Sequence, residues 1–246
     1  RWAFSLVAFM LRSSGGTTIQ PFGATGDLPI NADYDGDGKN DIAIYRPSLS
    51  QWWIQRSTAG LVAFQFGTTG DKTVAGDYTG DGKTDVAIFR PSNGNWWSLS
   101  SVNGQQINFP FGTVGDIPLP SDFDGDGRSD YVVFRPSSNQ WMRASSANGV
   151  QSNKTFGLAG DKPVIGDFDG DGKSDVAVYR PSDGNWWWWS SLDNIQRATR
   201  WGIATDIPAP TDYDGDGKTD FAVYRPSTGV WYIYNSATST PLIGPF

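Results

Sequence analysis

The sequence predicts an all-β fold, a β-propeller of four-stranded blades with five full repeats of about 45 residues and an N-terminal half repeat. The string DYDGDGKND at residues 33–41 recurs four more times, at steps of 44 or 45 residues. Turns rich in Gly, Pro, Asn and Asp divide each repeat into four short β-type segments. Adjacent tryptophans such as Trp52 and Trp53 need apolar surroundings on both faces of a strand, which neighbouring blades provide.

Each repeat has the same order of elements. An alternating apolar run follows the acidic string and ends in Arg-Pro-Ser, as in IAIYRPS at residues 42–48. A tryptophan-rich run, a polar turn and a last run complete the repeat. This length and strand number match a propeller blade better than a solenoid coil of roughly 20 to 30 residues. The repeats open with Phe-Gly or Trp-Gly at Phe22, Phe66, Phe111, Phe156 and Trp201.

The N-terminal residues 1–21 depart from this order and are separated from the five-repeat propeller, residues 22–246. Residues 12–22 match residues 56–66 in register, so the chain begins with the back half of a repeat. The preceding segment RWAFSLVAFML is mostly apolar and is too short to span a membrane. A signal-peptide core is an alternative, but a small-residue cleavage site is absent. We predict a strand that either completes this propeller or is donated head-to-tail to a neighbouring subunit, forming a filament through Trp2, Phe4 and Leu6.

The nine-residue acidic string is predicted to bind calcium. Aspartates at positions 1, 3, 5 and 9 direct carboxylate oxygens at one point, and position 7 adds a backbone carbonyl. Glycines at positions 4 and 6 let the chain curl around the ion. An EF-hand is excluded because the chain contains no glutamate for the twelfth position. The alternative is a metal-free Asx-Gly turn, which needs only one or two Asx residues.

The five loops differ in one ligand. Thr79 replaces the third-position aspartate of the second loop, so that loop has one carboxylate fewer and is predicted to be the weakest site. The predicted ligands at positions 1, 3, 5, 7 and 9 are Asp33, Asp35, Asp37, Lys39 and Asp41; Asp77, Thr79, Asp81, Lys83 and Asp85; Asp122, Asp124, Asp126, Arg128 and Asp130; Asp167, Asp169, Asp171, Lys173 and Asp175; Asp212, Asp214, Asp216, Lys218 and Asp220.

Composition restricts the function. The formal net charge is −7, and 19 of the 26 acidic residues lie in the five loops, so bound cations would offset most of the acidity. An acidic chain offers no electrostatic footprint for nucleic acid. Without cysteine or histidine, the chain has no disulfide, no thiol chemistry and no imidazole base or zinc ligand. Loops of this kind suit extracellular calcium levels, so we predict a secreted or cell-surface protein.

The Phe-Gly openings and the Asp-x-Asp-Gly-Asp-Gly-x-x-Asp loops resemble the FG-GAP or VCBS-type repeat family. Integrin-like α-subunit propellers, calcium-dependent fungal lectins and many bacterial surface proteins carry such repeats. The resemblance covers residues 22–246 and implies a β-propeller with calcium in a loop between two strands of each blade. It does not determine the function, because the fold serves many functions.

The sequence predicts a protein without enzymatic activity. Most aspartates belong to the loops, and no histidine or cysteine is available for a nucleophile and its base. Five aspartates outside the loops recur together with five arginines. We expect a structural pair in each blade, with a ring of ligand-binding charges as the alternative: Asp27, Asp71, Asp116, Asp161 and Asp206; Arg46, Arg90, Arg135, Arg180 and Arg225.

The tryptophans divide into two groups. We expect the first of each run to lie between blades, with a sugar platform as the alternative: Trp52, Trp96, Trp141, Trp186 and Trp231. Trp188 and Trp189 exceed what the sister repeats carry at those positions and predict a contact surface for a partner.

Two functions are compatible with this sequence. The first is a structural or adhesive extracellular module that assembles through its N-terminal strand, and the second is a lectin-like propeller that binds glycans between blades. A lectin is expected to repeat its pocket residues in several blades, whereas an assembly subunit needs one unique apolar patch, which this sequence shows. Asn153 also begins a glycosylation sequon.

Overall fold

All regular structure among the residues that the structure describes is β-strand. The computed structural model describes residues 5–11 and 17–244, with side chains described from residue 22 onward. These residues form strands and turns, and no helix among them is long and apolar enough to cross a membrane. The predicted all-β class is confirmed.

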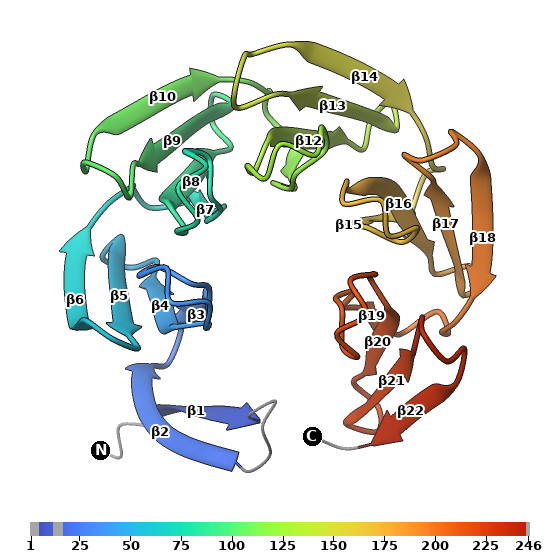
Figure 1. The fold of residues 1–246 in the computed structure, drawn as a ribbon, viewed down its shortest axis with the longest axis horizontal. Coiled ribbons are helices and arrows are strands. Elements are labelled where there is room, and N and C mark those ends of the chain that lie inside the picture. The colour runs from blue at the N-terminus through green and yellow to red at the C-terminus, as the bar shows by residue number, and fades with distance from the viewer. Residues whose placement is uncertain (1–4, 12–16, 245–246) are drawn as a thin grey trace. The chain divides into compact units, whose positions relative to one another are not determined.

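Five antiparallel sheets of four strands follow one another along the chain as blades of a β-propeller fold (Figure 1). The chain divides into two compact units, residues 1–114 and 115–246. The first unit contains blades 1 and 2. Blade 1 consists of β3 (Leu28–Pro29), β4 (Ile42–Arg46), β5 (Gln51–Arg56) and β6 (Gly60–Gln65). Blade 2 consists of β7 (Lys72–Thr73), β8 (Val86–Arg90), β9 (Asn95–Leu99) and β10 (Gln106–Pro110).

The second unit contains blades 3, 4 and 5, each with its strands paired in chain order. Blade 3 consists of β11 (Ile117–Pro118), β12 (Tyr131–Arg135), β13 (Gln140–Ala144) and β14 (Gln151–Thr155). Blade 4 consists of β15 (Lys162–Gly166), β16 (Asp175–Arg180), β17 (Asn185–Trp189) and β18 (Gln196–Arg200). Blade 5 consists of β19 (Ile207–Pro208), β20 (Phe221–Arg225), β21 (Val230–Tyr234) and β22 (Pro241–Gly244).

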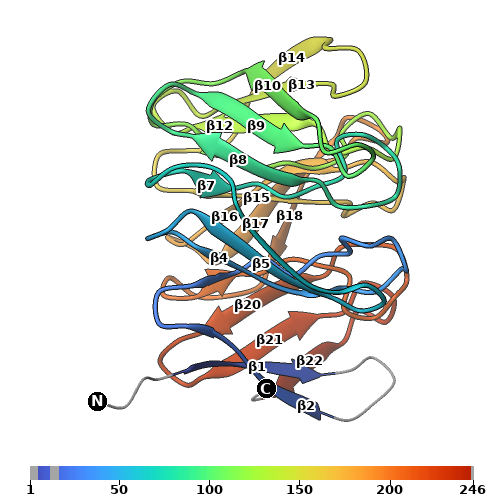
Figure 2. The ribbon, with the colours of Figure 1, turned by 90° about the vertical axis from the view of Figure 1, so that its left-hand side faces the viewer.

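Burial changes across each blade in the way the sequence patterns indicate. The second strand is apolar on both faces, and β4, β8 and β12 each bury their first four residues. The third strand alternates, so that β9 buries Trp96 and Ser98 and leaves Trp97 partly exposed. The fourth strand is mostly exposed, as in β10 and β14. In Figure 2, β8, β9 and β10 lie side by side with the twist usual for sheets.

The first tryptophan of each run belongs to the core. Trp52, Trp96, Trp141 and Trp186 are at most 1% exposed. Their indole N–H groups donate to the carbonyls of Phe66, Phe111, Phe156 and Trp201 over 2.6 to 3.2 Å. The predicted burial is confirmed for these four, and Trp52, Trp141 and Trp186 pack with residues of the next blade. Trp231 is only partly buried, and the residue matching those acceptors is Phe246, which lies outside the described residues.

The N-terminal hairpin is the outer half of a blade. β1 (Ser5–Leu11) pairs with β2 (Thr17–Ala24) in a separate two-stranded sheet. The pair Ala8↔Gln20 matches Trp52↔Phe64 of β5 and β6, shifted by 44 residues in both strands. β1 and β2 therefore correspond to the third and fourth strands of a blade, as the predicted half repeat requires. Of the three predicted contact residues, Leu6 falls in β1, whereas Trp2 and Phe4 lie outside the described residues.

Candidate metal centres and interblade pockets

Each acidic loop lies between the first and second strands of a blade and is curled by its two glycines. All ten of these glycines have positive φ, between 73° and 87°, a conformation that favours glycine. The first aspartate then caps the curl with both of its oxygens. In blade 1, Asp33 accepts the N–H groups of Gly36 and Gly38 over 2.6 and 2.7 Å. Asp77, Asp122, Asp167 and Asp212 do the same in their own loops.

The ninth-position aspartate is a buried anchor for the loop. Asp41 is 2% exposed and accepts the N–H groups of Tyr34, in its own loop, and Ser57, in the turn between β5 and β6. The same two bonds recur at Asp85, Asp130, Asp175 and Asp220. Burial raises the pKa of Asp130 and raises the pKa of Asp175 to about 6. Because it accepts one N–H from the loop and one from the outer turn, each of these carboxylates fixes the loop against the outer half of its blade.

Four of the five loops bring three carboxylates together. One oxygen from each member lies within 4.8 Å of the others in the clusters Asp33–Asp35–Asp37, Asp122–Asp124–Asp130, Asp167–Asp169–Asp175 and Asp212–Asp214–Asp220. The second loop has no such cluster among the described residues. There Thr79 Oγ1 lies 3.3 to 3.5 Å from carboxylate oxygens of Asp77, Asp81 and Asp85. A hydroxyl, which can donate its single proton to one of these carboxylates at a time, thus takes the place of the missing carboxylate.

The donor set fits a hard divalent cation. Carboxylate oxygens are the ligands that calcium prefers, and an oxygen that accepts one N–H retains a second lone pair. Asp35 Oδ1 is shielded from solvent and has no hydrogen-bond partner. A cation beside this oxygen would satisfy it. The position-7 backbone carbonyls, from Lys39, Lys83, Arg128, Lys173 and Lys218, remain predicted ligands.

Successive loops within a unit are joined at a repeated seam. The position-8 N–H of Thr84 donates to the carbonyl of Asp33 in the preceding blade over 2.7 Å, and Ser174 and Thr219 donate equivalently to Asp122 and Asp167. The position-7 lysine also packs against the preceding loop. A Cβ added to Gly36 would lie 2.9 Å from Cγ of Lys83, so the lysine stem occupies the space that the missing side chain leaves.

The five recurring aspartate and arginine pairs are structural ion pairs, as expected. Arg90 Nε and Nη2 donate to the two oxygens of Asp71, each over 2.9 Å. The aspartate side chain is 2% exposed, and its Oδ2 also accepts the N–H of Thr68. Arg46, Arg135, Arg180 and Arg225 bind Asp27, Asp116, Asp161 and Asp206 in the same bidentate way.

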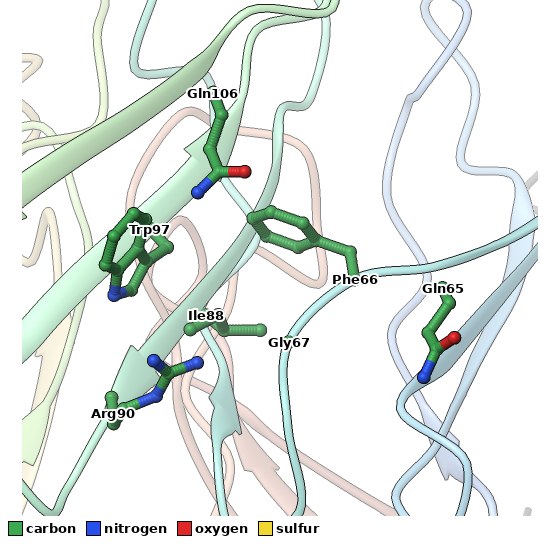
Figure 3. Close-up of a pocket in the computed structure, with 7 residues that line it drawn as sticks. All are labelled: Gln65, Phe66, Gly67, Ile88, Arg90, Trp97 and Gln106. Carbon is green, nitrogen blue, oxygen red and sulfur yellow. The ribbon is translucent and has the colours of Figure 1, made fainter.

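A pocket of about 370 Å³ lies between blades 1 and 2. Figure 3 shows the Phe66 ring facing Trp97 across it, with Ile88 and Arg90 at one end and Gln106 at the other. The Arg90 guanidinium lies 5.8 Å from the Trp97 ring centroid. The Trp97 indole N–H is buried and has no hydrogen-bond partner. The pocket therefore combines an aromatic wall with polar groups able to bond a ligand.

The same pocket occurs one blade earlier. A cavity of about 260 Å³ is lined by Phe22, Gly23, Ile44, Arg46, Trp53 and Leu61. Phe22 and Gly23 match Phe66 and Gly67, and Trp53 matches Trp97, at the 44-residue repeat. These linings were not predicted, because only the first tryptophan of each pair was weighed as a sugar platform, as the alternative to a core position. The signal was present in the second tryptophan, which faces the other way on the same strand.

The predicted partner surface at Trp188 and Trp189 needs a correction. Trp188 is 7% exposed and packs against Phe168, with ring centroids 5.7 Å apart, so it is not available as a contact residue. It occupies the position of Ile54, which is buried in blade 1. Trp189 is partly exposed, and its role in partner binding remains a prediction. Asn153 is exposed on β14 and its glycosylation likewise remains a prediction.

The FG-GAP-like repeat model matches residues 33–88, 122–178 and 167–223, more than half of the chain. The chain belongs to the FG-GAP-like repeat family. No curated protein sequence matches this FG-GAP protein.

Solved structures of low sequence identity share its fold. A virginiamycin B lyase from Staphylococcus aureus is 9% identical, with a TM-score of 0.65 over 97% of this chain and 77% of the lyase. An Agrocybe aegerita lectin specific for non-reducing terminal N-acetylglucosamine is 17% identical, with a TM-score of 0.60 over 90% of this chain and 65% of the lectin. A Bacteroides caccae protein of unknown function is 12% identical, with a TM-score of 0.54 over 95% and 79%. These likenesses concern the fold alone.

Proposed function

We propose that this FG-GAP protein is a non-enzymatic, calcium-stabilised adhesive module of the cell surface or extracellular space that recognises saccharides between its blades. The observation that supports saccharide recognition is the recurrence of one aromatic pocket lining, at Phe22 with Trp53 and at Phe66 with Trp97. A repeated pocket is what a lectin-like propeller requires. The fold shared with the Agrocybe aegerita lectin, which binds N-acetylglucosamine, is compatible with this proposal.

The chemistry of the pocket suits a sugar ring. Trp97 and Phe66 offer apolar aromatic surface for the C–H face of the sugar, and ligand sites typically combine such surface with a few placed polar groups. The Gln106 amide at the end of the pocket can bond hydroxyl groups. Asp71 holds the Arg90 guanidinium in place, so little side-chain entropy is lost on binding.

Calcium serves stability in this proposal. The aspartates at positions 1, 3, 5 and 9 of the loops would hold it, and the ion would neutralise carboxylates that otherwise repel one another. Because each ninth-position aspartate also binds the outer turn of its blade, a loop fixed by calcium fixes that turn as well. Weak loops of this kind fill at extracellular calcium levels, which supports a location outside the cytoplasm.

A glycan array probed with the intact protein in calcium-containing buffer tests the recognition proposal. We expect binding that Trp53→Ala and Trp97→Ala together weaken at least about tenfold, because both aromatic walls are lost. Leu192→Ala, which removes an exposed apolar side chain from another part of the protein, is the matched control. An array without binding, or unchanged binding by the double variant, contradicts the proposal.

Self-assembly through the N-terminal hairpin is the second candidate function. In blade 1, β5 pairs with β4 on one edge and β6 on the other, whereas among the described residues the matching strand β1 pairs only with β2. An unpaired strand edge readily accepts a strand from another molecule. The molecular mass in calcium-containing buffer, with and without residues 1–11, tests this. Oligomers that become folded monomers on deletion support assembly, and an intact protein that is monomeric at high concentration contradicts it.

A further inference from the structure

A second type of cavity lies at the junction of blades 3 and 4, within the second unit. Its volume is about 250 Å³, and its lining includes Arg143, Lys154, Lys173, Trp189 and Asn194. Three cationic side chains therefore converge on one small space. Phe123 and Arg143 also line a neighbouring cavity of about 220 Å³ beside Asp124 and Asp130 of the third loop.

Among the described residues the two central cations form no close ion pair, although Asp130 and Asp124 lie near enough to attract the Arg143 guanidinium. Arg143 Nε donates to Ser152 Oγ over 3.1 Å, and its guanidinium carbon lies 5.2 Å from the Phe123 ring centroid. Lys154 Nζ lies 3.2 Å from the Trp189 ring centroid and donates to Asn194 Oδ1 over 3.2 Å. Neither side chain forms an ion pair, in contrast to the five arginines that end the second strands.

The one carboxylate in the lining is already committed. Asp175 is 1% exposed and accepts the N–H groups of Phe168 and Ser191 over 2.9 and 2.6 Å. Burial lowers the pKa of Arg143, against a smaller opposing effect from the charges of Asp130 and Asp124, and burial together with the charge of Arg143 lowers the pKa of Lys154. Burial therefore makes both positive charges less favourable, and a bound anion would offset part of that free energy.

The sister blades show that the fold does not require these cations. The residues matching Arg143 are Ile54, Ser98, Trp188 and Ile233, all of them buried. The residues matching Lys154 in the fourth strands are Phe64, Phe109, Thr199 and Gly244. Blade 3 alone combines two cations at positions that the other four blades fill without charge, so the architecture offers no reason for them.

We propose that the cavity between blades 3 and 4 binds a carboxylate or sulfate group, with Arg143 and Lys154 as the cations that recognise it. The Arg143 guanidinium supplies N–H donors beyond Nε, and planar guanidinium groups match the two oxygens of such anions. Lys154 is oriented from both sides, by the Trp189 ring and the Asn194 amide oxygen. This site differs from the aromatic pockets in its charge.

Isothermal titration of the full chain in calcium-containing buffer tests this, with glucuronate, inorganic sulfate and glucose as probes at constant ionic strength. We expect the anions to bind and glucose not to bind. Arg143→Ile and Lys154→Thr use residues from sister blades, and each should weaken anion binding about tenfold or more, as for a lost charge-assisted hydrogen bond. Arg200→Gln removes an exposed charge at the far end of β17 and β18 and should bind as the wild type does.

The outcomes separate the alternatives. Tighter binding of glucuronate than of sulfate assigns an acidic saccharide, and the reverse assigns a sulfated or inorganic ligand. If Arg143 only neutralises Asp124 and Asp130, Arg143→Ile will bind the anions as tightly as the wild type, which overturns the proposal. Absence of binding by either anion, or equal binding of glucose, overturns it as well. Thermal unfolding of both variants checks that they fold. This test does not depend on saccharide binding at Trp97, so the two proposals can fail independently.

Discussion

Trp96 and Trp97 are neighbours on β9, yet they have opposite surroundings. Trp96 is 1% exposed, and its indole N–H donates to the carbonyl of Phe111 over 2.7 Å. Trp97 is partly exposed on the other face, lines a pocket and has an unpartnered indole N–H. The first tryptophan has all its bonds within the protein, whereas the second keeps one unused. One face of β5 and β9 therefore belongs to the buried core, and the other face lines a pocket that is available for a ligand.

Removing calcium is expected to have the largest effect on overall stability and to leave the pocket lining chemically unchanged. A ligand present at a thousandfold excess over its Kd stabilises by about 4 kcal/mol per site, and several loops act together. Chelation should therefore lower the melting temperature of the intact protein markedly in differential scanning calorimetry, and restored calcium should reverse the change. A melting temperature that is the same in calcium and in chelator contradicts calcium binding by the loops.

The matched pair Trp96→Ala and Trp97→Ala tests the comparison directly. Trp96→Ala creates a core cavity and should lower the free energy of unfolding by about 3 to 5 kcal/mol. Trp97→Ala removes a partly exposed side chain and should cost about 1 kcal/mol, while weakening saccharide binding at its own pocket and leaving the Trp53 pocket intact. Chemical denaturation monitored by circular dichroism measures both variants. Equal destabilisation by the two changes would show that the faces of β9 do not divide core from pocket.

Asp71→Asn should have an intermediate effect, because it weakens the ion pair that holds Arg90 beside the pocket. The Asp71 side chain is 2% exposed and that of Arg90 is 26% exposed, so solvent offsets part of the loss. We expect a decrease of about 2 kcal/mol in the free energy of unfolding, below the range for fully buried pairs. The control is Asp193→Asn, which breaks an exposed pair with Arg197 and should leave the unfolding curve unchanged.

Thr79→Asp is expected to have the smallest effect on overall stability, because the change is confined to one loop. The change completes the carboxylate set of the second loop, where the Thr79 hydroxyl now lies near three aspartates. The variant should bind calcium more tightly at that loop and be less stable than the wild type in chelator, since a fourth carboxylate adds repulsion. Calcium titration calorimetry measures the site. If the wild-type second loop is already the tightest, the count of carboxylates does not determine affinity here.

The buried core and the ion pairs of the blades could be predicted from the sequence, because the residues that form them recur in every repeat. Positions such as Trp52 and the pair Asp27 and Arg46 recur at a fixed interval, and a feature present in every repeat is explained by the repeat itself. The register of the N-terminal half repeat was predicted for the same reason. The loops were placed correctly between strands, and Thr79 identified the exceptional one.

The pockets could not be predicted from the repeat alone, and the exposure of Trp188 was predicted wrongly. A pocket depends on how one blade packs against the next, which no local pattern specifies. Trp188 was read as a surplus aromatic residue, although the alternation along its strand puts it on the buried side with Trp186. The role of Arg143 depends on side chains from the neighbouring blade, which the sequence around a single arginine does not specify.

The seam between successive loops has a consequence for how such chains change in length. The bond joining them runs from a backbone N–H at position 8 to a backbone carbonyl at position 1, as in Thr84 with Asp33, and requires no particular side chain at either end. A duplicated repeat therefore carries both the donating N–H and the accepting carbonyl, and it can form this bond with the repeat before it and the repeat after it. Duplication or deletion of a whole repeat can then add or remove a blade within a unit without any compensating substitution at this backbone bond.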